Sequence, residues 1–156
     1  MRSARCLVPV ALLAGFAAVS CTKGTDGLEV LQADLSGSNE VPARNTGATG
    51  TAGITIEGQT VHFVVEVHNI QAVSLSHIHS GAAGSNGPVR VNFYTGPVTG
   101  PLNGILAQGS FTAADVKGVS FDELLSELRS GNAYVNVHSP TFPAGEIRGQ
   151  TRLVAQ

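Results

Sequence analysis

Most of the chain alternates apolar and polar residues with a period of two, and glycine or proline interrupts the pattern repeatedly. In residues 60–70 (TVHFVVEVHNI), Phe63 and three valines share one face, whereas His62 and His68 fall on the other. Successive side chains of a β-strand point to opposite faces, so this pattern indicates half-buried strands. Such strands are expected at residues 28–35, 50–57, 60–70, 74–79, 89–94, 105–112, 132–138 and 146–154. The sequence therefore predicts an all-β fold, an antiparallel Greek-key-like sandwich or barrel of about eight strands.

One short helix is expected to interrupt the strands. Ser120 followed by Glu123 has the spacing of a capping box, and Gly131 stands where a C-terminal glycine commonly ends a helix. The pattern predicts a helix over residues 121–129. Residues 57–59 are a hairpin-turn candidate, and residues 81–88, 96–104 and 140–145 are rich in glycine, proline or asparagine and are expected to be loops.

The first twenty residues have the form of a secretory signal. Arg2 and Arg5 precede an uncharged apolar run, residues 7–19, that is too short to span a bilayer. The run ends at Ala18-Val-Ser-Cys21, which resembles a bacterial lipobox although leucine is usual where Ala18 stands. This predicts a signal peptide at residues 1–20, lipidation of Cys21 as a membrane anchor, and a flexible tether at 21–27 before a domain at 28–154. The alternative is an ordinary secretory peptide with Cys21 as a free thiol.

Charge excludes one class of partner. The chain has a formal net charge of −2 and only 9 basic residues. Nucleic-acid binding requires a clustered basic surface, so no nucleic-acid partner is expected. The expected location is instead the bacterial cell envelope, on the extracytoplasmic side of a membrane to which the lipid at Cys21 attaches the protein.

Several longer strings occur in an order that identifies a family. They are residues 35–42 (LSGSNEVP), 46–50 (TGATG), 76–84 (SHIHSGAAG), 86–89 (NGPV), 131–138 (GNAYVNVH) and 145–150 (GEIRGQ). Together they resemble the CHRD domain, which is named from chordin and is common in secreted bacterial proteins. The resemblance covers about residues 28–154. It implies a secreted β-sandwich module and does not by itself imply an activity.

Three histidines form a candidate metal site. His77 and His79 are two residues apart on one expected strand, so their side chains leave the same face, about 6.6 Å apart along the strand. His138 ends the strand 132–138, where the alternation places it away from the core. If the two strands are neighbours, three outward-facing imidazoles meet on the surface. Imidazole without carboxylate favours copper, with zinc as the alternative, and affinity should fall below about pH 6.5 as the rings protonate.

This pattern is similar to that of copper-zinc superoxide dismutase, in which a His-x-His strand and a distant Val-His strand carry copper on a β-barrel. No further histidine or aspartate in this chain matches a bridged zinc position, and no intramolecular disulfide is expected. The resemblance therefore implies at most a single copper ion on His77, His79 and His138, with one coordination position open.

Other polar residues have competing interpretations. Glu146 and Arg148 are either a surface ion pair or a support for His138, if the last two strands form a hairpin. His62 and His68 are expected on the solvent face, and the three metal candidates could instead be structural. Three functions stay open: a lipid-anchored metal-binding module, a protein–protein or envelope interaction module, and a superoxide dismutase-like redox enzyme. A non-enzymatic role is favoured, and no catalytic residue is assigned.

Overall fold

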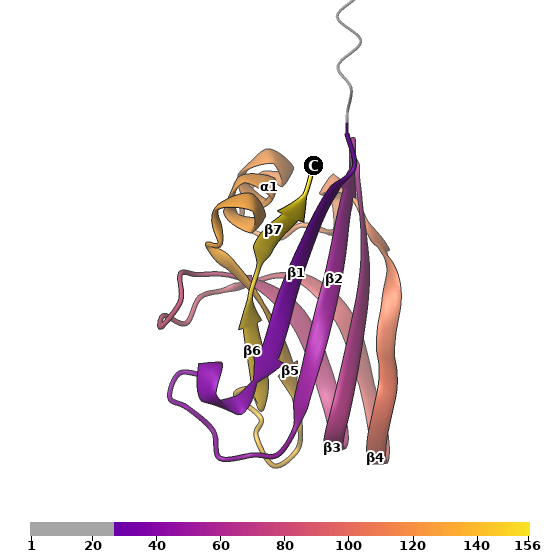
Figure 1. Cartoon of the computed structure of the whole chain (residues 1–156), viewed down its shortest axis with the longest axis vertical. Helices are drawn as coiled ribbons and strands as arrows, with labels where there is room; N and C mark the ends of the chain where they lie inside the picture. Colours follow the sequence, from indigo (N-terminus) through magenta and orange to yellow (C-terminus); the bar gives the residue numbers. More distant parts are fainter. Residues whose placement is uncertain (1–26) are drawn as a thin grey trace, which may run out of the picture.

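The structure is a computed structural model that describes residues 27–156, so the predicted signal peptide and Cys21 lie outside the described residues. In chain order the elements are β1 (Glu29–Ser36), η1 (Gly37–Asn39), β2 (Thr49–Glu57), β3 (Thr60–Ser80), β4 (Val89–Phe111), η2 (Ala113–Asp115), α1 (Phe121–Ser130), β5 (Ala133–His138), β6 (Ile147–Gln150) and β7 (Arg152–Ala155). Seven strands form one barrel-like antiparallel sheet, which confirms the predicted all-β class (Figure 1).

The sheet closes through β3, a strand of 21 residues. Its first half pairs with β2, from His68 opposite Thr49 to Thr60 opposite Glu57, and its second half pairs with β5. The order β2-β1-β6-β5-β3 then returns to β2. Between the two halves the register shifts several times and Asn69 takes a φ of 56°, so the strand bends from one part of the sheet to the other.

β4 accompanies β3 for almost its whole length, as Figure 1 shows. We expected separate strands at 60–70 and 74–79, and again at 89–94 and 105–112, with a loop at 96–104. That division is wrong: residues 96–104 lie inside the 23-residue strand β4. The backbone hydrogen bonds that β3 offers along its edge hold this glycine- and proline-containing stretch extended, so pairing overrides the local turn preference.

The helix is almost as predicted. α1 ends one residue later than expected, the Ser120 side chain accepts a hydrogen bond from the Glu123 backbone, and Gly131 closes the helix in the left-handed region. Leu124 and Leu128 are fully buried, and α1 contacts β5 and β7 (Figure 1). Within residues 27–156, no helix has both the length and the apolar character that crossing a membrane requires.

The hydrophobic core fills the interior of the sheet. Its fully buried members come from every part of the barrel and include Leu31, Ala33, Val65, Val67, Ile78, Val135, Val137 and Ile147. They are the inward-facing residues of the alternating strands, as the period of two requires. The opposite face of β5 is also buried, so polar side chains form a second buried layer outside the core, beneath the loops that follow β1 and β3.

Candidate metal site

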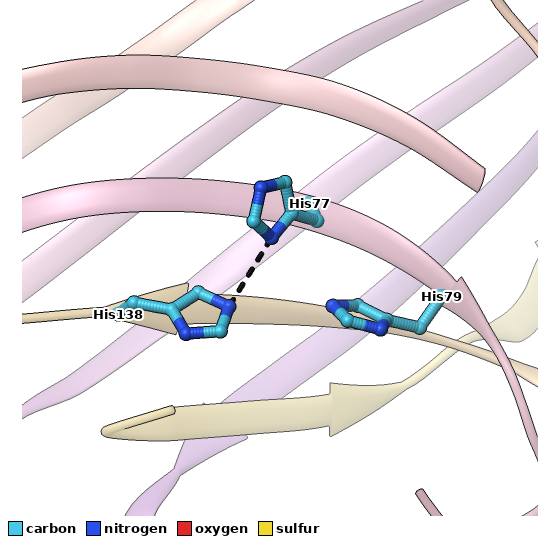
Figure 2. A group of neighbouring side chains, drawn as sticks. All are labelled: His77, His79 and His138. Carbon is cyan, nitrogen blue, oxygen red and sulfur yellow. Dashed lines mark hydrogen bonds between the residues drawn. The ribbon is translucent and has the colours of Figure 1, made fainter. Parts of the chain in front are cut away.

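The three histidines come together on neighbouring strands. β5 pairs antiparallel with β3, which puts His138 opposite Leu75, and His77 and His79 follow on the same face of β3. One potential ligand nitrogen from each ring lies within 4.8 Å of the other two. Figure 2 shows the rings of His77, His79 and His138 turned toward one another. The pairing of β3 with β5 therefore brings the three histidines together, as expected if these two strands are neighbours.

Their burial differs from the expectation of an exposed site. His77, His79 and His138 are only 7%, 9% and 8% exposed. They do lie on the face opposite the core, since Ile78 and Val137 are fully buried in the core between and beside them. However, the loop 81–88 contacts His79 through the Gly87 carbonyl, and the turn 140–145 contacts His138 through the Pro143 carbonyl, so both segments lie against this face. The surface location predicted from alternation is thus wrong, because alternation cannot show what covers a face.

Backbone carbonyls fix two of the rings. Nδ1 of His79 donates a hydrogen bond to the Gly87 carbonyl oxygen at 2.9 Å, and Nδ1 of His138 donates one to the Pro143 carbonyl oxygen at 3.0 Å. A carbonyl oxygen can only accept, so each Nδ1 carries the proton and each Nε2 is unprotonated, with a lone pair that can accept a hydrogen bond or bind an ion. Metal-bound histidines commonly have this arrangement, in which the second nitrogen is held by a carbonyl group.

The free nitrogens face a common space. Nε2 of His79 is buried and has no hydrogen-bond partner. Nε2 of His138 lies 3.2 Å from Nδ1 of His77 (Figure 2). Ligand nitrogens about 2.0 Å from a tetrahedral ion are about 3.3 Å from each other, so this pair already has the separation that an ion needs. Because Nε2 of His138 is unprotonated, Nδ1 of His77 donates the hydrogen bond between them, and ligation of an ion through this Nδ1 would require its proton to move to Nε2.

Electrostatics keep the rings neutral. Burial and, after it, the neighbouring His138 and His79 together lower the pKa of His77 to about 4. Burial also lowers the pKa of His79 and of His138, although the carbonyl hydrogen bond of each ring opposes the change. Neutral imidazole is the ligating form. The expected loss of metal affinity near pH 6.5 is therefore corrected to a more acidic range.

Tyr134 packs against one face of the His79 ring, and Arg148 packs against Tyr134. The Tyr134 ring stacks on the His79 ring with the centroids 4.8 Å apart and the planes 8° from parallel. The Arg148 guanidinium lies 3.4 Å from the centroid of the Tyr134 ring. The Tyr134 hydroxyl also accepts a hydrogen bond from the Gly87 backbone, the residue whose carbonyl binds His79. A cation, a phenol ring and an imidazole thus form one column that sets the plane of His79.

Arg148 is not the surface residue that one interpretation predicted. It is 1% exposed, and its guanidinium donates to the carbonyl oxygens of Ala82 and Ser85 and to the side chain of Asn86. These bonds fasten residues 81–88 over the histidines. The hairpin on which the other interpretation depended does form, since β5 pairs with β6, but Arg148 packs on the Tyr134 ring that stacks on His79.

Glu146 is also buried, and its carboxylate accepts a hydrogen bond from the Thr46 hydroxyl at 2.7 Å. Within residues 27–156 it forms no ion pair with Arg148 and no hydrogen bond with His138. The exposed histidines follow the prediction: the side chains of His62 and His68 are 52% and 48% accessible, each near a glutamate.

Sequence reasoning missed three residues of this layer, namely Glu40, Tyr134 and Asn136. Tyr134 and Asn136 alternate with His138 along β5, so the period of two would have placed them on its face. Glu40 follows η1 and had no such signal. It accepts a hydrogen bond from the Asn136 amide at 2.7 Å, and burial raises its pKa despite the nearby Arg148 and Arg44.

The comparisons with known proteins agree with the strings noted in the sequence. The family model described as the CHRD domain matches residues 31–151. Chordin from Xenopus laevis is 28% identical over 134 residues, which cover 80% of this chain but 13% of that protein. No solved structure matches the chain. Since the family model matches most of the chain, from within β1 to just after β6, the chain belongs to the CHRD domain family.

Proposed function

We propose that this CHRD domain binds one copper ion through His77, His79 and His138. The observation that carries the proposal is the buried Nε2 of His79, which has a free lone pair and no partner beside two more imidazole nitrogens. A metal ion supplies what this nitrogen lacks. Three imidazoles without a carboxylate or thiolate suit copper or zinc, and copper(II) binds more tightly than zinc(II) to a given nitrogen site.

Calorimetric titration of the metal-free domain with copper(II) and zinc(II) tests this proposal. We expect one ion per chain, with copper bound more tightly. Substitutions around metal ligands already cost about 10- to 100-fold in affinity, so loss of a ligand in His79→Ala or His138→Ala should cost more. His68→Ala is the matched control, because His68 is exposed on the same strand as His79.

Circular dichroism of each variant establishes that the barrel is still folded. If folded His79→Ala and His138→Ala bind copper as the unaltered domain does, the site is not the one proposed. Binding would then belong elsewhere, and the three rings would be structural members of the buried layer.

The proposal includes a location. A lipid at Cys21 would hold the domain at the extracytoplasmic face of the bacterial envelope, and the motif at residues 18–21 supports this. Replacement of Cys21 by Ser should move the protein from the membrane fraction to the soluble fraction. Equal amounts in the membrane fraction before and after the substitution would contradict lipidation.

A second function, binding of a protein partner, has its own observation. β4 is paired on one edge with β3, and among residues 27–156 no strand pairs with its other edge. Ile105 on this strand is 57% exposed. An unpaired strand with an apolar side chain can add a strand from another chain. The proposed copper site and the unpaired edge of β4 are different parts of the barrel, so one function can be absent without the other.

A further inference from the structure

Two buried acceptor atoms in the layer of the histidines have no donor. One is Nε2 of His79 and the other is the side-chain oxygen of Asn136, a residue that is 3% exposed. They belong to neighbouring strands, since Asn136 pairs with His77 and Tyr134 pairs with His79 across the β5–β3 ladder. Burial of an acceptor without a partner is unfavourable, so each of these two atoms calls for a partner.

The surroundings of Asn136 show which way its amide points. Nδ2 donates to Glu40 at 2.7 Å, and a Cβ on Gly145 would lie 2.6 Å from the same Nδ2. Gly145 lies just before β6, the strand on the other side of β5 from β3. The nitrogen therefore occupies the β6 side, and the oxygen is left on the β3 side, where His77 and His79 are.

We infer that Asn136 Oδ1 accepts a hydrogen bond from the small molecule that fills the fourth position of the metal ion. The inference rests on the proposed copper site, in which three imidazoles leave one position open. An ion alone satisfies His79 but provides no hydrogen to Asn136. Amide oxygen is a ligand better suited to magnesium or calcium than to copper, so direct coordination by Asn136 is disfavoured.

The chemical class of the ligand follows from the acceptor. Its ligating atom carries a hydrogen, as in water, an alcohol or an amine. An anion with no hydrogen, such as azide, cannot donate to Asn136 and so lacks the hydrogen bond that would add to the affinity of a hydrogen-bearing ligand. Asn136 therefore favours the hydrogen-bearing ligand in the competition for the ion.

Azide competition on the copper-loaded domain measures this preference, with the azide-to-copper absorption band as the signal. Azide has to displace the water on the copper ion, and in the unaltered domain this breaks the hydrogen bond from that water to Asn136. Asn136→Leu removes the acceptor and keeps a side chain of similar size, so the displacement no longer costs a hydrogen bond. Azide should therefore bind to this variant about five- to tenfold more tightly than to the unaltered domain. Asn92→Leu is the control. Asn92 pairs with His77 from the opposite side, on β4, and is exposed, so its loss should leave azide affinity unchanged.

The outcomes separate this inference from the proposed function. Failure of the unaltered domain to bind copper refutes the site itself. Full copper loading of Asn136→Leu with unchanged azide affinity refutes only the role of Asn136. A crystal structure of the copper-loaded unaltered domain decides the matter even if the variant does not fold. A ligand atom within about 3.2 Å of Asn136 Oδ1 supports the inference, and a longer distance or direct metal–oxygen coordination overturns it.

Discussion

Acid should destabilise the metal-free domain in a pH range set mainly by His77. Burial and, to a smaller extent, the charges of His138, His79 and Lys117 lower the pKa of this ring to about 4 in the folded state, against an ordinary value of 6.5. Between these two values the unfolded chain binds a proton that the folded protein does not. The free energy of unfolding therefore rises with pH across this range. The contribution of His77 to stability is lost as the pH falls from about 6.5 toward 4.

The size of the effect follows from the two pKa values of His77. A shift of one unit corresponds to about 1.4 kcal/mol, so His77 alone removes at most about 2 kcal/mol by pH 5 and about 3 kcal/mol by pH 4. The pKa values of His79 and His138 are lowered by burial as well, so both act in the same direction. Losses of this size are a large part of the stability of an ordinary domain.

Urea unfolding followed by circular dichroism, in the presence of a chelator and at a series of pH values, measures the effect. His77→Gln should flatten the dependence between about pH 6.5 and 4.5, because the side chain no longer titrates. His62→Gln is the control, since His62 is exposed on the same strand. A stability that does not change over this range, or an equal slope in His77→Gln and the unaltered domain, would refute the account of a buried neutral ring.

Two further substitutions test local features of the fold. Ser120→Ala removes the cap of α1 and should lower the free energy of unfolding by about 1 kcal/mol while copper affinity stays constant; a large loss of copper affinity would contradict this separation of helix and site. Gly145→Ala should be more damaging, because Gly145 has a φ of 126° and an added Cβ would lie 2.6 Å from both Asn136 and Glu40. We expect a loss of about 2 kcal/mol or more in urea unfolding, against little change for Gly47→Ala, whose Cβ would meet no atom within 4 Å. Equal stabilities of the two glycine variants would show that the turn relaxes around the added methyl group.

The sequence predicts those parts of the fold that depend on neighbours along the chain. Ser120, Glu123 and Gly131 define α1 nearly to the residue, because capping is a local interaction. The alternation of apolar residues places Ile78 and Val137 in the core for the same reason. Residues 96–104 were predicted wrongly because their conformation depends on β3, whose paired residues are distant in sequence.

The candidate site also has features that local sequence determines and features that depend on contacts between distant residues. The His77–His79 spacing and the alternation before His138 are local, and they identify the three rings. The burial of those rings depends on residues 81–88, which are fastened by Arg148 from more than sixty positions away. No local pattern contains that contact. Glu40 reaches Asn136 across 96 positions, so its place in the layer could not be predicted either.

The pairing of the first and last strands has a consequence for how such a domain can be combined with other proteins. Val30 lies opposite Ala155 in the β1–β7 pair, so the folded body begins and ends at one end of the barrel (Figure 1). A unit with adjacent entry and exit points can be inserted into a longer polypeptide without separation of its flanks. The same geometry permits circular permutation, in which a short linker joins β7 to β1 and new termini open at the turn around Gly58. That rearrangement would relocate both ends of the chain while leaving the β3–β5 ladder, and the three histidines on it, uncut.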